Sequence, residues 1–142
     1  MILPDLNLLL YAYNPHAPQH LRAKEWWEWA INGRELIGLP HEITLGFVRI
    51  ATNPRMGQSA VPMAAAKAVV ERWLKIPAVR VLLPQEDHVL KAMSLMERSA
   101  TSGQLASDAS LAVYAIEARA TLCSNDSDFA RFPGLAWKNP LL

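Results

Sequence analysis

The sequence predicts an α/β fold in which helices cover both faces of a parallel sheet. Short apolar runs that resemble strands alternate along the chain with longer segments at helical spacing, which is typical of parallel sheets. The ten prolines lie mostly between these segments and mark their boundaries. We therefore expect a three-layer α/β/α arrangement with a central parallel sheet of four to five short strands.

Length and composition favour one globular domain. The chain has 142 residues, and a domain commonly has about 100–200. Hydrophobic residues make up 51% and charged residues 19%, which excludes intrinsic disorder, because disorder needs low hydrophobicity. No linker, repeat or low-complexity segment divides the sequence, so we expect residues 1–142 to form a single domain.

The N-terminal third begins with a strand and two helices. Met1–Pro4 is a short apolar run that predicts a buried strand, and Leu6–Tyr13 predicts a short helix. Helical spacing resumes from Pro18 to about Ile31, and Gly33 supplies a stop signal just beyond it.

The middle of the chain repeats the alternation. Strands are predicted at Leu36–Leu39 and at the β-branched run Val79–Leu83. A helix opens at Pro40 and ends near Asn53, and a second, Ala-rich helix covers Pro62–Ile76. Glu86–Ser99 again has helical spacing.

The C-terminal part predicts one more helix and two strands. Ser107–Ala118 is helical, with Ser107 or Asp108 near its N-cap, and it leads into a buried strand at Thr121–Ser124. Ala136–Lys138 predicts a short edge strand.

Acidic residues gather where these strands end. Asp5 directly follows the first strand, and Asp126 and Asp128 follow the strand at 121–124. Asp108 begins the helix before that strand, and Glu42 lies in the first turn of the helix after the second strand. Because open parallel sheets bind ligands at the carboxyl ends of their strands, the five carboxylates can converge at one rim.

Each acid also has an ordinary structural interpretation. Acids such as Asp108 and Glu42 commonly cap helices or interact with their dipoles, and Asp126-Ser-Asp128 is typical of a turn. As a set, however, clustered like charges repel and raise one another's pKa unless a cation compensates them. Mg²⁺ and Mn²⁺ prefer carboxylate and water oxygens, so the set predicts a divalent-cation site.

Three segments carry a resemblance to a known family: MILPDLNLLLYAYN, PHEITLGFVRI and SGQLASDASLAVYAIEARATLCSNDSDFARFPGLAWKNPLL. Together they resemble the PIN-domain ribonucleases, and most closely the VapC toxins of type II toxin–antitoxin pairs. The resemblance covers essentially the whole chain. It assigns the acidic quartet that holds the metal to Asp5, Glu42, Asp108 and Asp126, a fifth outer acid to Asp128, and supporting polar positions to Asn7 and Ser124.

Two positions depart from the family pattern. Pro4 stands where a β-branched residue is usual, and Arg119 occupies a turn that often carries Gly. Neither residue is one of the acids, so the assignment of the site is unaffected.

The resemblance implies a Mg²⁺-dependent endoribonuclease, with Mn²⁺ able to substitute. It further implies a structured RNA substrate such as tRNA or rRNA, inhibition by a cognate VapB-like antitoxin, and a homodimer. Carboxylates, cations and water suffice for such cleavage, since a bound ion lowers the pKa of its water. Neither a signal peptide nor a membrane span is expected, and with a single cysteine, Cys123, we expect a reducing cytoplasm.

Charge and aromatic patterns do not decide which surfaces contact nucleic acid or a partner protein. The formal net charge is +1, so any nucleic-acid contact must use a local basic patch. Such a patch, or a merely solvated helix face, could be formed by Arg49, Arg55, Lys67, Arg72 and Lys75. The helix carrying Trp26, Trp27 and Trp29 predicts either a wide buried face or a partner interface.

Two functions of other classes are alternatives. Receiver-like phosphoacceptor domains also gather acids at strand ends, and Lys138 matches their lysine near the last strand. Their acceptor Asp, however, should end the middle strand, where Leu83 and Pro84 stand. A metal-free binding module on the same fold is the other alternative. The zinc-protease pattern H-E-x-x-H begins at His41 but fails at Leu45.

Overall fold

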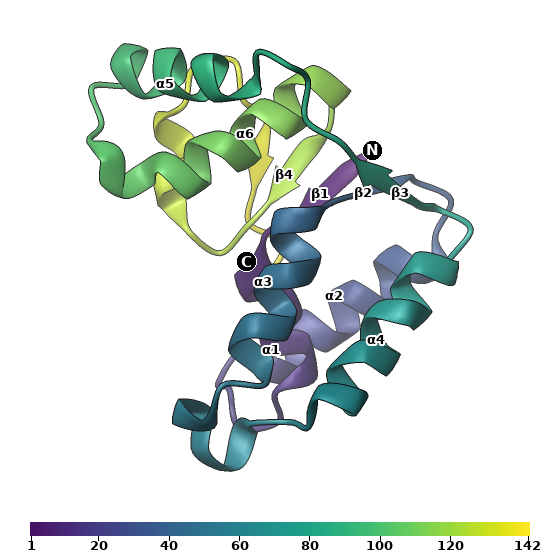
Figure 1. Ribbon diagram of the computed structural model, residues 1–142. Helices are drawn as coiled ribbons and strands as arrows, with labels where there is room; N and C mark the ends of the chain where they lie inside the picture. Colours follow the sequence, from purple (N-terminus) through teal and green to yellow (C-terminus); the bar gives the residue numbers. More distant parts are fainter.

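A computed structural model describes residues 1–142 and contains one five-stranded, fully parallel sheet. Its strands lie in the order β3-β2-β1-β4-β5, so the first strand of the chain is the central one (Figure 1). The strands are β1 (Ile2–Pro4), β2 (Ile37–Pro40), β3 (Val79–Leu82), β4 (Thr121–Cys123) and β5 (Trp137–Lys138).

Six α-helices connect the strands and form two groups on opposite sides of the sheet (Figure 1). One group is the pair α5 and α6, and the other is α1 to α4. The helices are α1 (Leu6–Tyr13), α2 (His20–Asn32), α3 (His41–Ala51), α4 (Met63–Lys75), α5 (His88–Arg98) and α6 (Ala106–Ala118). The predicted α/β/α class is confirmed, with five strands.

The starts of two helices differ from prediction because turns precede them. Helix α2 begins at His20 rather than Pro18, after turn residues. Helix α6 follows directly from a 3₁₀ turn at Gly103–Leu105, so its N-cap is Leu105, which makes no side-chain cap bond. Ser107 and Asp108 lie near this N-cap, as predicted, but neither side chain makes a cap hydrogen bond.

Arg119 ends α6 in the left-handed conformation, with φ 53° and ψ 38°. Its N–H bonds the carbonyls of Ala115 and Ile116, which closes the last turn of the helix. The conformation explains why this turn often carries Gly in the family that the sequence resembles, because Gly has no Cβ to strain there.

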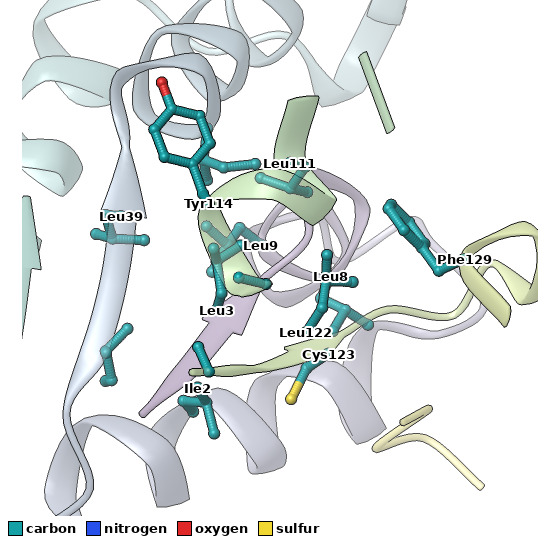
Figure 2. Packing of buried hydrophobic residues seen from close by; sticks show 14 of the residues in the cluster. Ile2, Leu3, Leu8, Leu9, Leu39, Leu111, Tyr114, Leu122, Cys123 and Phe129 are labelled. Carbon is teal, nitrogen blue, oxygen red and sulfur yellow. The ribbon is translucent and has the colours of Figure 1, made fainter. Parts of the chain in front are cut away.

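The core lies on both faces of the central strand. Leu3 on β1 and Leu8 and Leu9 on α1 pack near Leu122 on β4 and Leu111 on α6 (Figure 2). All of them are buried. Because β1 is covered on both sides, its sequence is continuously apolar up to the residue at which it ends.

Aromatic side chains form a second packing centre between α1, α2, α3 and α4. The buried Trp73 ring makes edge-to-face contacts with Tyr13, Trp27 and Phe47 at centroid distances of 5.6, 5.8 and 4.7 Å. Trp26 is also buried, whereas Trp29 is 59% exposed. The tryptophan helix is therefore part core and part surface.

No helix of the chain combines the length and the apolar character needed to cross a membrane.

We predict that Tyr13→Phe lowers the free energy of unfolding by about 1–3 kcal/mol, because it leaves a buried donor unpaired. The Trp73 indole N–H donates to the Tyr13 hydroxyl at 2.8 Å. Denaturant unfolding measures the change. The matched control is Tyr11→Phe, since the Tyr11 hydroxyl lies in the same helix and has no partner within the chain. Equal effects of the two variants would contradict the prediction.

Candidate active site

The pairing of β1 with β4 brings two polar residues together at the ends of these strands. Pro4 pairs with Cys123, so the residues that follow, Asp5 and Ser124, lie side by side. The Asp5 N–H donates to the Cys123 carbonyl at 2.8 Å. The Ser124 hydroxyl donates to Asp5 Oδ2 at 2.7 Å, and both side chains are buried.

Asp5 is held through both of its carboxylate oxygens. Oδ1 accepts from the Leu6 N–H at 2.7 Å, which makes Asp5 the N-cap of α1. Burial raises the pKa of Asp5, the hydrogen bonds from Ser124 and Leu6 act in the opposite direction, and the charge of Asp126 adds to the rise. The carboxylate is thus fixed in place but costly to ionise.

Ser124 also connects Asp5 to Asp126. Its hydroxyl oxygen accepts from the Asp126 N–H at 3.0 Å while its proton goes to Asp5. Asp126 Oδ1 accepts from the Asp128 N–H at 2.9 Å and so begins the 3₁₀ turn at Ser127–Arg131. Asp128 pairs with Arg131 at 3.6 Å. The turn predicted for Asp126-Ser-Asp128 and its proximity to Asp5 are both present.

Asp108 enters from the first turn of α6 and is half-buried. Burial is the largest cause that raises its pKa from 3.8 to about 6, and the charges of Asp5, Asp126 and Asp128 follow. A helix N-terminus favours an ionised acid by typically about 0.3–1 kcal/mol, so burial and repulsion outweigh the dipole here. These four residues, Asp5, Asp108, Asp126 and Asp128, are called the aspartate pocket below.

Glu42 contacts the N-terminal part of α6, the helix that carries Asp108. It is exposed in the first turn of α3, and its Oε1 accepts from the Ser110 hydroxyl at 3.0 Å. Burial, followed by the charge of Glu42 and a hydrogen bond with it, raises the pKa of Tyr114 to about 12. Glu42 is not among the charges that raise the pKa of Asp108. Asn7 is exposed on α1.

The sequence did not reveal the residues that bond Glu42. Ser110 connects it to His88, the first residue of α5, whose Nε2 lies 2.8 Å from the Ser110 hydroxyl. One signal was available: Tyr114 falls within a buried helix, and a buried tyrosine hydroxyl usually finds a partner. That tendency predicts that the Tyr114 hydroxyl has a hydrogen-bond partner, but it does not identify Glu42 as the partner.

The donor set of the pocket suits a hard, hydrated cation. It offers carboxylate oxygens, and Arg131 is the basic group paired with it. No three His, Cys, Asp or Glu side chains stand close enough together to hold an ion by themselves. Mg²⁺ commonly keeps several water ligands and uses one or two carboxylates, so the arrangement fits a partly hydrated ion.

Comparison with known proteins gives one family and several full-length relatives. The profile of the PIN domain matches residues 2–135. Ribonuclease VapC33 of Mycobacterium tuberculosis is 44% identical over 141 residues, which cover 99% of both chains. Ribonuclease VapC37 of the same organism is 34% identical and covers 99% of this chain and 97% of its own.

Solved structures show the same fold at low identity. The M. tuberculosis VapC20 structure, described as a sarcin–ricin loop cleaving toxin, matches with a TM-score of 0.71 and 17% identity, covering 96% of this chain and 99% of that one. VapBC2 from Rickettsia felis, bound to a DNA fragment from its promoter, matches with a TM-score of 0.66 and 18% identity over 98% of both chains.

We predict that Asp108→Asn stabilises the metal-free protein at neutral pH by about 1 kcal/mol, a value reduced for the partial exposure of the group. Because the folded-state pKa is about 6 against 3.8 for the free group, the folded protein binds the proton more tightly. The destabilisation caused by ionised Asp108 is therefore absent below the free pKa of 3.8. It grows as pH rises from 3.8 to about 6 and is complete above the folded-state pKa.

Melting curves of both proteins in EDTA across this pH window measure the difference. The wild type should lose stability relative to Asp108→Asn as pH rises. The exposed acid Asp87, which is paired with Lys91 at 3.4 Å, supplies the control variant Asp87→Asn, which should gain nothing. A destabilised Asp108→Asn at neutral pH would contradict the electrostatic argument.

Proposed function

Since the chain belongs to the PIN-domain family and, within it, to the VapC ribonucleases, we propose that it is a metal-dependent endoribonuclease toxin. The observation that carries the metal-dependent step is the aspartate pocket, in which burial and then the charges of Asp5, Asp126 and Asp128 raise the pKa of Asp108 to about 6. Enzymes commonly place such perturbed groups where they act.

The proposed ligands of Mg²⁺, or of Mn²⁺ in its place, are one or two of the carboxylates of Asp5, Asp108 and Asp126 together with the ion's own waters. Asp128 is an outer acid, and Glu42 is the proposed fourth member of the acidic quartet. When bound, the ion supplies charge neutralisation and lowers the pKa of a coordinated water. Ser124 holds the Asp5 carboxylate and the Asp126 backbone in place for it. Asp108 would hold the ion in its ionised form, because ligands bind metals in their deprotonated form.

The proposed substrate is a structured RNA, such as tRNA or rRNA. The description of VapC20 as a toxin that cleaves the sarcin–ricin loop supports this class without naming the RNA for this chain. At a net charge of +1, phosphate contacts depend on local groups. Exposed basic residues are available at Arg49 and Arg55 and along α4 at Lys67, Arg72 and Lys75.

The fold gives the phosphoacceptor alternative no support. Strand β3, after which that mechanism requires its acceptor, lies at the edge of the sheet and is followed by Leu83 and Pro84. A metal-free binding module would share the fold, and calorimetric titration with Mn²⁺ separates it from the nuclease.

We predict that Asp5→Asn and Asp108→Asn abolish RNA cleavage while the protein stays folded, because each removes a charged ligand from the pocket. Excess EDTA should have the same effect on the wild type, and added Mn²⁺ should reverse it. Gel analysis of a tRNA and rRNA pool measures cleavage, and Asp87→Asn is the matched control that keeps activity. The products should carry 5′-phosphate and 3′-hydroxyl ends. Full activity in EDTA, or a 2′,3′-cyclic phosphate, would refute the proposed chemistry.

The proposed partner is a VapB-like antitoxin, and we place both proteins in the cytoplasm, with the toxin as a homodimer. VapBC complexes among the solved structures of this fold support the partner.

The exposed Trp29 ring lines a hollow of about 300 Å³ together with Arg22, Trp26 and Leu141. Exposed tryptophans commonly anchor interfaces.

We predict that Trp29→Ala weakens antitoxin binding at least ten-fold, because an interface anchor typically contributes about 2 kcal/mol or more. Calorimetry with the co-encoded antitoxin measures the affinity. Leu90→Ala removes a comparably exposed apolar side chain from α5 and should leave the affinity unchanged. Unchanged binding by Trp29→Ala would place the partner surface elsewhere, and sedimentation showing only monomer would refute the homodimer.

A further inference from the structure

A hydrogen-bonded chain runs from α5 through α6 to α3, beside the aspartate pocket. His88 Nε2 lies 2.8 Å from the Ser110 hydroxyl, and that hydroxyl lies 3.0 Å from Glu42 Oε1. The three residues come from three different helices. Their contact therefore depends on how those helices pack.

The direction of each bond follows from counting protons. A serine hydroxyl has one proton, and here it goes to the Glu42 carboxylate, which can only accept. The bond between Ser110 and His88 must then use a proton on His88 Nε2. The ring therefore donates and cannot act as a base toward Ser110. This excludes a nucleophilic serine of the triad type, in which the imidazole removes the hydroxyl proton.

The inner end of the hydrogen-bonded chain is buried and packed against an aromatic ring. His88 is 8% exposed, and its ring lies against the Tyr114 ring at a centroid distance of 4.3 Å. Tyr114 lies near Glu42, whose charge adds to the rise of the Tyr114 pKa that burial causes. The Tyr114 hydroxyl points away from the apolar residues around Leu3 and Leu9 (Figure 2). Two buried aromatic residues thus support one exposed carboxylate.

The outer end opens on a cavity of about 430 Å³. Its lining includes Glu42, His88, Ser110 and Tyr114, and also Ser107, which precedes Asp108 in the chain. The held carboxylate therefore faces open space at the N-terminal end of α6, the helix that carries Asp108 in its first turn. A network that served only to pack the core would have no reason to end there.

We propose that Ser110 and His88 are positioning residues for RNA cleavage, which fix the Glu42 carboxylate at the edge of the aspartate pocket. The proposal rests on the proposed nuclease function. Without the Ser110 hydroxyl, an exposed glutamate side chain samples many rotamers, and Glu42 spends less time where the reaction needs it. Loss of such supporting partners typically lowers activity about 10–100-fold.

The test compares four variants in steady-state RNA cleavage. Ser110→Ala removes the bridging hydroxyl, and His88→Phe keeps a ring against Tyr114 but removes the donor. Each should lower kcat about ten-fold with little change in KM. His88→Gln keeps an N–H donor near the position of Nε2 and should restore most of the lost kcat. Ser94→Ala removes an exposed hydroxyl elsewhere on α5 and is the matched control.

A double-mutant cycle separates positioning from a general structural effect. In a Glu42→Ala background, Ser110→Ala should cause no further loss of kcat, because its effect passes through Glu42. Independent, multiplying losses would overturn the proposal, as would wild-type kcat in Ser110→Ala. Melting curves must show all variants folded at the assay temperature.

NMR gives a readout that does not need cleavage. Ring-nitrogen shifts of neutral His88 should show the proton on Nε2 in the wild type, and this preference should weaken in Ser110→Ala. A proton on Nδ1 in the wild type would overturn the positioning chain whether or not the protein cleaves RNA. A wild type that shows the Nε2 tautomer but does not cleave RNA would refute the nuclease proposal. It would also refute the positioning role in cleavage. The hydrogen bonds among His88, Ser110 and Glu42 would still be confirmed.

Discussion

The register between β1 and β4 is the constraint on which the site depends. Three consecutive pairs, from Ile2 with Thr121 to Pro4 with Cys123, fix where both strands end. A slip of one residue would turn every side chain of the strand to the other face of the sheet. Ser124 would then lose its bond to Asp5, and the link from Ser124 to the Asp126 backbone would no longer reach the carboxylate that it now connects.

The destabilising acidic groups and the stabilising apolar packing lie in different parts of the fold. The acids lie at the ends of the strands, where burial and mutual repulsion raise the pKa of Asp5 and Asp108. Compensating packing lies elsewhere, in the leucines around β1 and in the aromatic contacts of Trp73 with α1, α2 and α3. A functional site commonly costs stability that the remainder of the domain supplies.

Much of this arrangement could be predicted from the sequence, because parallel strands place their carboxyl ends on one edge. That rule alone brings Asp5 and Asp126 together. The 3₁₀ turn that precedes α6 and places its N-cap at Leu105 could not be predicted in the same way. The contact of His88 with Ser110 depends on how α5 packs against α6, and no local pattern in the sequence records that packing.

The order of the strands also governs when the site can exist during synthesis. The central strand is made first, and its neighbour β2 follows within about 35 residues at residues 37–40. Its other neighbour comes far later: Ser124 lies 119 residues after Asp5. A nascent chain therefore leaves the ribosome with Asp5 unpaired on that side, and a fragment that stops before β4 has no pocket at all. The proposed cation site is complete only when residue 126 has emerged and β4 has paired with the first strand, so the proposed catalysis requires the whole domain.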